Sequence, residues 1–263
     1  MYSFTYERPS VLADAARLTA AGAKPLAGGQ TLLASMKLRL SDPGQLVDLA
    51  GVAQLAGISR EGNTLVIGAM TRHADVAANE AVRSAIPALA ELAGNIGDKQ
   101  VRAMGTIGGS LANNDPAADY PAAALGLGAT IVTNQREIPA DEYFQGLFTT
   151  ALQDGELITA VRFPVPQKAA YMKFKQPASL FALIGVFVAK TPGGVRVAVT
   201  GGGNGVFRHQ ALEAALSANL TPQAAANVPL SNEGLGSDLH ASTAYRAQLV
   251  RVMAERAVAK AAA

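Results

Sequence analysis

Two glycine pairs, the first of them followed by an expected helix, constrain this chain more than any other feature of its sequence. Gly28-Gly29 follows a short extended run, residues 24–27, and Gly108-Gly109 lies beside two hydroxyl side chains in residues 106–110. Because glycine has no Cβ, successive backbone N–H groups in such a turn can point at one spot and hold phosphate oxygens. One Gly-Gly is usually a structural turn, but two with neighbouring hydroxyl or amide groups indicate a ligand with two phosphates.

The spacing of the glycines excludes the two commonest nucleotide-binding motifs. A Rossmann site needs Gly-x-Gly-x-x-Gly after its first strand, and a P-loop needs Gly-Lys followed by Ser or Thr; neither occurs here. A third glycine-rich run, residues 201–205, follows an expected strand. We interpret that run as a turn between elements rather than a phosphate site.

The charge balance and the missing cysteine exclude several further classes of protein. The 22 basic and 20 acidic side chains leave a formal net charge of +2, and the basic residues are scattered along the chain. We therefore expect no nucleic-acid partner. With no cysteine, the chain cannot itself hold a disulfide, a zinc–thiolate site or a cysteine-ligated Fe–S cluster.

The N-terminus and the apolar runs favour a cytoplasmic protein. The first residues lack the basic and then apolar pattern of a signal peptide. The longest apolar runs, residues 122–132 and 181–189, are shorter than the roughly 18 residues that span a bilayer. We therefore expect no transmembrane segment.

The order of expected helices and strands predicts an α+β protein. In the first part strands and helices mix irregularly, with one helix expected from Asn79 through Leu92, while residues 105–121 predict loop and short helix. The second part reads as strands followed by helices, and its strand-like runs are residues 171–175, 181–190 and 195–200. We predict two domains, residues 1–168 and residues 169–263.

No set of side chains in the sequence suggests acid–base or nucleophilic catalysis. By spacing alone, Asp115 is interpreted as a helix cap and Asp119 as a solvated charge; the alternative is that Asp119 accepts hydrogen bonds from a ribityl or ribose tail. Lys175 is either an outward-facing strand residue or an anion contact. The histidines are far apart and are interpreted as surface or capping residues: His73, His209 and His240.

Taken together, the motifs of this chain resemble those of a known family. Residues 27–33 read Ala-Gly-Gly-Gln-Thr-Leu-Leu, residues 105–112 read Gly-Thr-Ile-Gly-Gly-Ser-Leu-Ala, and residues 115–119 read Asp-Pro-Ala-Ala-Asp. In order and spacing they resemble the two FAD-binding signatures in the medium subunit of molybdenum hydroxylases, the carbon monoxide dehydrogenase and xanthine dehydrogenase type. The likeness covers essentially the whole chain.

The resemblance implies a fold and a set of cofactor contacts. The first domain would be a two-lobed FAD-binding domain of the vanillyl alcohol oxidase-like (PCMH) type, and the second a small domain with a three-stranded antiparallel sheet and helices. The implied FAD contacts are Leu26, Ala27, Gly28, Gly29, Gln30, Thr31, Leu32, Leu33, Ile96, Thr106, Gly108, Gly109, Ser110, Asp119, Ile158 and Lys175.

The resemblance also implies that the chain transfers electrons, which agrees with the lack of side chains suited to acid–base or nucleophilic catalysis. Substrate would be oxidised at a molybdenum–pterin cofactor on a large partner subunit, and two [2Fe–2S] clusters on a small partner subunit would feed electrons to FAD on this chain. An external acceptor would then take them. Such complexes are dimers of heterotrimers, and this chain would have no metal ligands of its own.

Two departures from the family pattern and two alternative functions stay open at this point. Met104 stands where the family commonly has Arg, and Leu180 where it often has Asp before an aromatic residue, so the surroundings of the flavin ring differ. The alternatives are a self-sufficient flavin-dependent oxidase or dehydrogenase of the same fold, and an FAD-free assembly scaffold.

Overall fold

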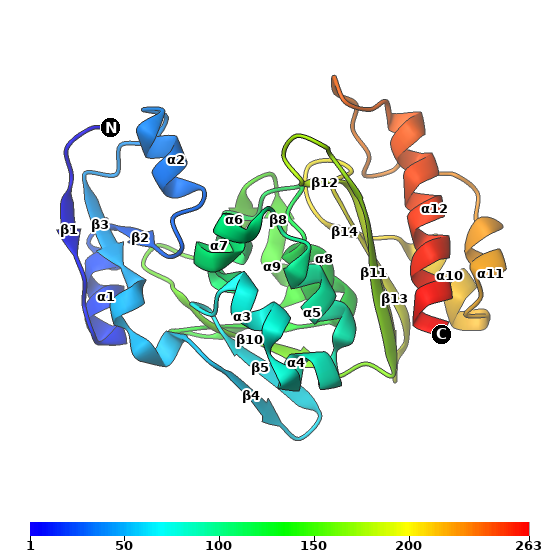
Figure 1. Ribbon diagram of the computed structural model, residues 1–263, viewed down its shortest axis with the longest axis horizontal. Helices are drawn as coiled ribbons and strands as arrows, with labels where there is room; N and C mark the ends of the chain where they lie inside the picture. Colours follow the sequence, from blue (N-terminus) through cyan, green and yellow to red (C-terminus); the bar gives the residue numbers. More distant parts are fainter. Residues whose placement is uncertain (263) are drawn as a thin grey trace.

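The computed structural model describes residues 1–262, which form an N-terminal lobe, a central lobe and a C-terminal sheet with its own helices (Figure 1). The N-terminal lobe, drawn in blue at the left, contains a parallel sheet in the order β1-β3-β2. Its elements are β1 (Thr5–Glu7), α1 (Leu12–Ala20), β2 (Lys24–Leu26), α2 (Leu32–Lys37), β3 (Gln45–Asp48), η1 (Leu49–Gly51) and η2 (Ala53–Leu55).

The central lobe is built on an antiparallel sheet in the order β4-β5-β10-β6-β7. Its strands are β4 (Ile58–Glu61), β5 (Thr64–Gly68), β6 (Thr130–Thr133), β7 (Glu137–Pro139) and β10 (Ile158–Pro164), with a hairpin of β8 (Phe144–Gly146) and β9 (Thr149–Thr150). Its helices are α3 (His73–Ala78), α4 (Glu80–Ala85), α5 (Pro87–Gly94), α6 (Lys99–Met104), α7 (Ile107–Asn113), α8 (Tyr120–Leu127) and α9 (Ala140–Tyr143). This irregular mixture confirms the α+β prediction.

The single helix expected from Asn79 through Leu92 is wrong, because the chain breaks between α4 and α5. The Asn79 side chain accepts a hydrogen bond from the Val82 N–H and caps α4 as expected. Pro87, however, disfavours helical backbone at Ile86, which lies at φ −140° and ψ 74°. Proline is well placed as the first residue of α5, where no N–H partner is needed.

The C-terminal part is an antiparallel sheet in the order β11-β12-β13-β14 with three helices. Its elements are β11 (Lys168–Lys175), β12 (Ala182–Thr191), β13 (Gly194–Thr200), β14 (Phe207–Arg208), α10 (Gln210–Ala218), α11 (Pro222–Ala226) and α12 (Thr243–Ala262). The three long strands are those predicted, and the two-residue β14 adds a fourth at the edge.

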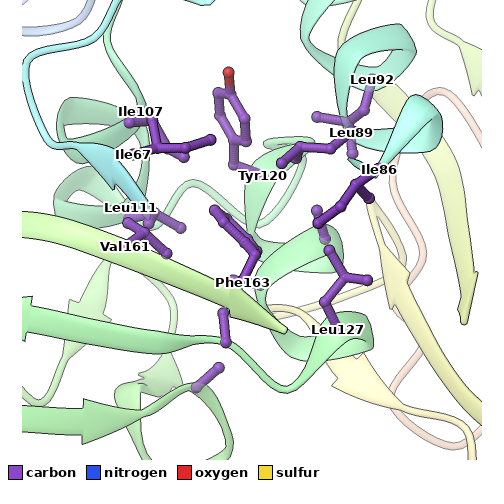
Figure 2. Close-up of a cluster of buried hydrophobic side chains, with 14 of the residues drawn as sticks. Ile67, Ile86, Leu89, Leu92, Ile107, Leu111, Tyr120, Leu127, Val161 and Phe163 are labelled. Atoms are coloured by element: carbon purple, nitrogen blue, oxygen red, sulfur yellow. The ribbon is translucent and has the colours of Figure 1, made fainter. Parts of the chain in front are cut away.

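Both faces of the C-terminal sheet are covered. Figure 1 shows the sheet between α5 and α8 of the central lobe on one side and α10 and α12 on the other. Residues 182–189 of β12 are accordingly all buried. Phe187 belongs to the central core, whose other members include Leu89, Tyr120 and Phe163 (Figure 2), while Val186 belongs to the core beneath α12. The C-terminal sheet therefore contributes side chains to two hydrophobic cores, one on each face.

Within residues 1–262, none of the helices combines the length and the apolar character needed to cross a bilayer.

Candidate functional site

The two glycine motifs, distant in sequence, lie against each other in the structure. A Cβ atom on Gly28 would lie 2.0 Å from the carbonyl oxygen of Met104 and 2.7 Å from the Cα atom of Gly105. A Cβ atom on Gly109 would lie 3.4 Å from the Cβ atom of Ala27. Any side chain at residue 28 would therefore push the two loops apart, so glycine is required there for close approach of the two backbones.

The first loop leaves backbone donors free. Within residues 1–262, the N–H groups of Gly28, Gly29, Gln30 and Thr31 make no hydrogen bond to the protein. Gly29 takes φ +71°, a conformation that glycine adopts without strain. Successive N–H groups before a helix form a site for phosphate oxygens. The arrangement fits the pyrophosphate of a dinucleotide.

The second loop uses its backbone donors within the protein. The N–H of Ile107 donates to Thr71 O (3.1 Å), that of Gly108 to Ala69 O (2.8 Å), and that of Gly109 to Thr106 Oγ1 (3.1 Å). A Cβ on Gly108 would lie 2.6 Å from the Cβ of Ala69. Gly108 therefore lets α7 pack closely against Ala69, and the second motif lies against the first loop with its own donors already used.

The solvated position expected for Asp119 is wrong, because its side chain is buried. Tyr171 Oη donates to Asp119 Oδ1 (2.5 Å) and Lys173 Nζ donates to Asp119 Oδ2 (2.9 Å), both from β11. Burial raises the pKa of the Asp119 carboxyl, and the charge of Lys173 opposes that rise. Spacing in the sequence could not show this, because both partners lie more than 50 residues away.

Asp115 also differs from its expected role as a helix cap. Its carboxylate accepts a hydrogen bond from the Ala117 N–H (2.9 Å), two residues on, whereas α8 begins only at Tyr120. Asp115 therefore stabilises a local Asx turn.

Ile96 and Lys175 lie on two sides of one turn. Lys175 Nζ donates to Asn95 Oδ1 (2.9 Å), and Arg102 Nη1 donates to the carbonyl oxygens of Ile96 and Gly97 (2.9 Å each). Beside this turn lies a groove of about 200 Å³, lined by Glu91, Leu92, Asn95, Tyr171, Met172, Lys173, Lys175 and Lys260. The remaining predicted contact, Ile158, is buried in β10 and packs in the central core.

The surface or capping role expected for His73 is wrong, because His73 is buried and lies within α3, whose N-cap is Arg72. Its Nε2 lies 2.6 Å from where a Cβ atom on Gly105 would be, and its ring centroid lies 5.3 Å from that of Tyr120. Burial first, and the charge of Arg102 second, lower its pKa to about 4, so the imidazole is neutral at neutral pH. A lone histidine carries no signal in the sequence that would reveal this position beneath the second loop.

The interpretations of the other two histidines and of the third glycine-rich run are confirmed. His209 Nδ1 accepts a hydrogen bond from the Leu212 N–H (3.3 Å) and caps α10, and His240 is exposed. The glycine run 201–205 is a packing turn, since a Cβ on Gly203 would lie 2.1 Å from the carbonyl oxygen of Gly234.

Comparisons with known proteins agree with this geometry. Residues 2–166 match the family described as the FAD binding domain in molybdopterin dehydrogenase. The chain is 36% identical to the carbon monoxide dehydrogenase medium chain of Afipia carboxidovorans, over 99% of this chain and 97% of that protein. It is 34% identical to the glyceraldehyde dehydrogenase medium chain of Sulfolobus acidocaldarius, over 97% and 96%.

The fold agrees as well. Carbon monoxide dehydrogenase from Hydrogenophaga pseudoflava contains a chain that superposes with a TM-score of 0.91 at 35% identity, over 99% of this chain and 97% of that one. Quinoline 2-oxidoreductase from Pseudomonas putida 86 gives the same TM-score at 28% identity, with the same coverage. The chain with the paired glycine loops therefore belongs to the FAD-binding medium subunits of the molybdenum hydroxylases, which are oxidoreductases.

Proposed function

We propose that this chain is the FAD-carrying electron-transfer subunit of a heterotrimeric molybdenum hydroxylase in the cytoplasm. It would receive electrons from two [2Fe–2S] clusters on a small partner subunit and deliver them to an external acceptor. Substrate would be oxidised at a molybdenum–pterin cofactor on a large partner subunit, and two heterotrimers would form the complete complex. The family membership and the relatives' names as medium chains support this assignment.

The observation that carries the proposal is the run of free backbone donors in the first loop. We propose that the four N–H groups of residues 28–31 bind the FAD pyrophosphate, with Leu26, Ala27, Leu32 and Leu33 beside it. The second loop, with Thr106, Gly108, Gly109 and Ser110, would form the wall behind it. Ile96, Asp119, Ile158 and Lys175 complete the proposed contacts.

In this proposal the protein binds and orients its cofactor and takes no part in proton transfer to substrate. FAD, when bound, supplies reversible electron exchange. The chain's own groups that are suited to holding the cofactor are the backbone donors of the first loop. The sequence has no motif that is typical of acid–base or nucleophilic catalysis.

We also propose that residues 1–168 and 169–263 are the two domains. The separate core beneath α12 supports a division near β11, because it is built from residues 170–258 alone. The family match, which ends at residue 166, is consistent with the same division.

The proposal is tested by purifying the chain alone and with its large and small partner subunits. We expect a yellow protein that releases FAD in about equimolar amount, is inactive alone, and supports turnover only with both partners. Turnover of an organic substrate by the isolated chain would instead indicate a self-sufficient oxidase. A colourless chain in a complete, active complex would indicate a scaffold.

A further inference from the structure

A buried ion pair connects the C-terminal sheet to the FAD-binding domain. Asp119 precedes α8 and Lys173 lies in β11, and each side chain is only 3% exposed. The Lys173 ammonium lies 2.9 Å from Asp119 Oδ2 and also donates to the carbonyl oxygen of Asn95 (3.2 Å). Asn95 directly precedes Ile96, so one cation contacts the side chain of one proposed FAD contact and the backbone next to another.

Further hydrogen bonds attach the segment before Asp119 to the same sheet. Thr200 Oγ1, at the end of β13, lies within hydrogen-bond distance of the carbonyl oxygens of Pro116 (2.9 Å) and Ala118 (2.7 Å), and its one proton can be donated to either of them. The Gly201 N–H also donates to Pro116 O (2.8 Å). The last residues of the second FAD signature are therefore positioned by strands from the other domain.

A pair of this kind is sensitive to the loss of one partner. Removing one member of a buried ion pair leaves an uncompensated charge, whereas removing both at once is far less costly. Without its ammonium partner, the Asp119 carboxyl would be driven to take up a proton or to turn away, since Tyr171 Oη alone would remain as its donor.

We propose that Lys173 is a positioning residue for FAD binding, which holds the Asp119 carboxyl group in its orientation, so that β11 completes a site built on the other domain. This inference rests on the proposed function, because it takes Asp119 as an FAD contact. The competing interpretation is that the pair only joins the two domains and has no bearing on the cofactor.

The test is titration of full-length apo-protein with FAD, followed by the flavin's absorption and fluorescence, alongside urea unfolding of each variant. Lys173→Met should raise the Kd for FAD by about tenfold or more. Lys168→Met is the matched control on the same strand; its ammonium is exposed and, within residues 1–262, donates only to Ala262 O, so the Kd should not change.

The double variant Asp119→Asn/Lys173→Met separates positioning from structural support. It should recover most of the stability that Lys173→Met loses, because both charges are gone, yet keep the raised Kd for FAD. Recovery of the wild-type Kd together with stability would overturn the inference. If Lys173→Met does not fold, a raised Kd in a stable double variant would exclude lost stability as the cause and support a role of the pair in FAD binding. If Lys173→Met binds FAD with the same Kd as the wild type, the inference about Lys173 is wrong but the proposed function stands. If the wild-type chain does not bind FAD, the proposed function is wrong as well.

Discussion

At the scale of single residues, Gly28 determines how closely the two loops approach. Gly28→Ala would place a Cβ 2.0 Å from the carbonyl oxygen of Met104, so the loops must separate. We expect FAD affinity to fall by about tenfold or more and the free energy of unfolding to fall by about 1–3 kcal/mol, as for other overpacked sites. FAD titration and urea unfolding measure the two effects. Gly193→Ala, whose nearest neighbour would be Thr191 Oγ1 at 3.9 Å, should change neither.

His73 makes the stability of the folded chain depend on pH. Its folded pKa, about 4, lies below the ordinary value of 6.5, so the unfolded chain takes up a proton first as pH falls. This contribution is complete above the unfolded pKa and is lost as pH falls from about 6.5 towards about 4. It amounts to about 2 kcal/mol between roughly pH 7.5 and pH 5.

Urea unfolding of wild type and His73→Gln at several pH values isolates this effect, since glutamine does not titrate in that range. We expect the wild type to lose about 2 kcal/mol more than the variant over the window. Parallel pH profiles for the two proteins would contradict the buried, neutral assignment of His73.

At the scale of elements, Thr106 fixes where α7 begins. Its Oγ1 accepts the Gly109 N–H at 3.1 Å, while the two preceding N–H groups of the helix donate to the segment at residues 69–71. Thr106→Val keeps the shape of the side chain but removes the acceptor, so we expect a loss of about 1 kcal/mol in the free energy of unfolding. Thr106→Ser should retain most of it. Equal losses in the two variants, measured by urea unfolding of apo-protein, would argue against a capping role.

At the scale of the whole molecule, the shared sheet should make the two domains unfold together. Phe187 is fully buried and packs in the central core, although its strand belongs to the C-terminal sheet. Phe187→Ala should cost about 3–5 kcal/mol, and we expect one transition at lower denaturant rather than early loss of the C-terminal part.

Because the chain has no tryptophan, far-UV circular dichroism and tyrosine fluorescence are the suitable probes for this variant. Coincident transitions by both probes are the expected result. A separate early transition would mean that the sheet is only weakly coupled to the central lobe.

Local backbone rules made some of this molecule predictable. Three kinds of feature depend on neighbours within a few residues: the glycine pairs next to hydroxyl and amide residues, the Asn79 cap, and the strand-like runs after residue 166. The structure confirms the helix start and the three strands. The family was predicted from the order of the two glycine motifs, because the two motifs together are specific although each is weak alone; the family match confirms it.

The sequence by itself thus determined the α+β class, the family and the two glycine loops, because these depend on residue type and local spacing. Only the tertiary structure decided which loop keeps free N–H groups, that Asp119 pairs with Lys173, and that His73 lies beneath Gly105. The physical reason is that burial, charge pairing and donor satisfaction depend on atoms contributed by segments far apart in the chain. Local patterns carry no record of these contacts.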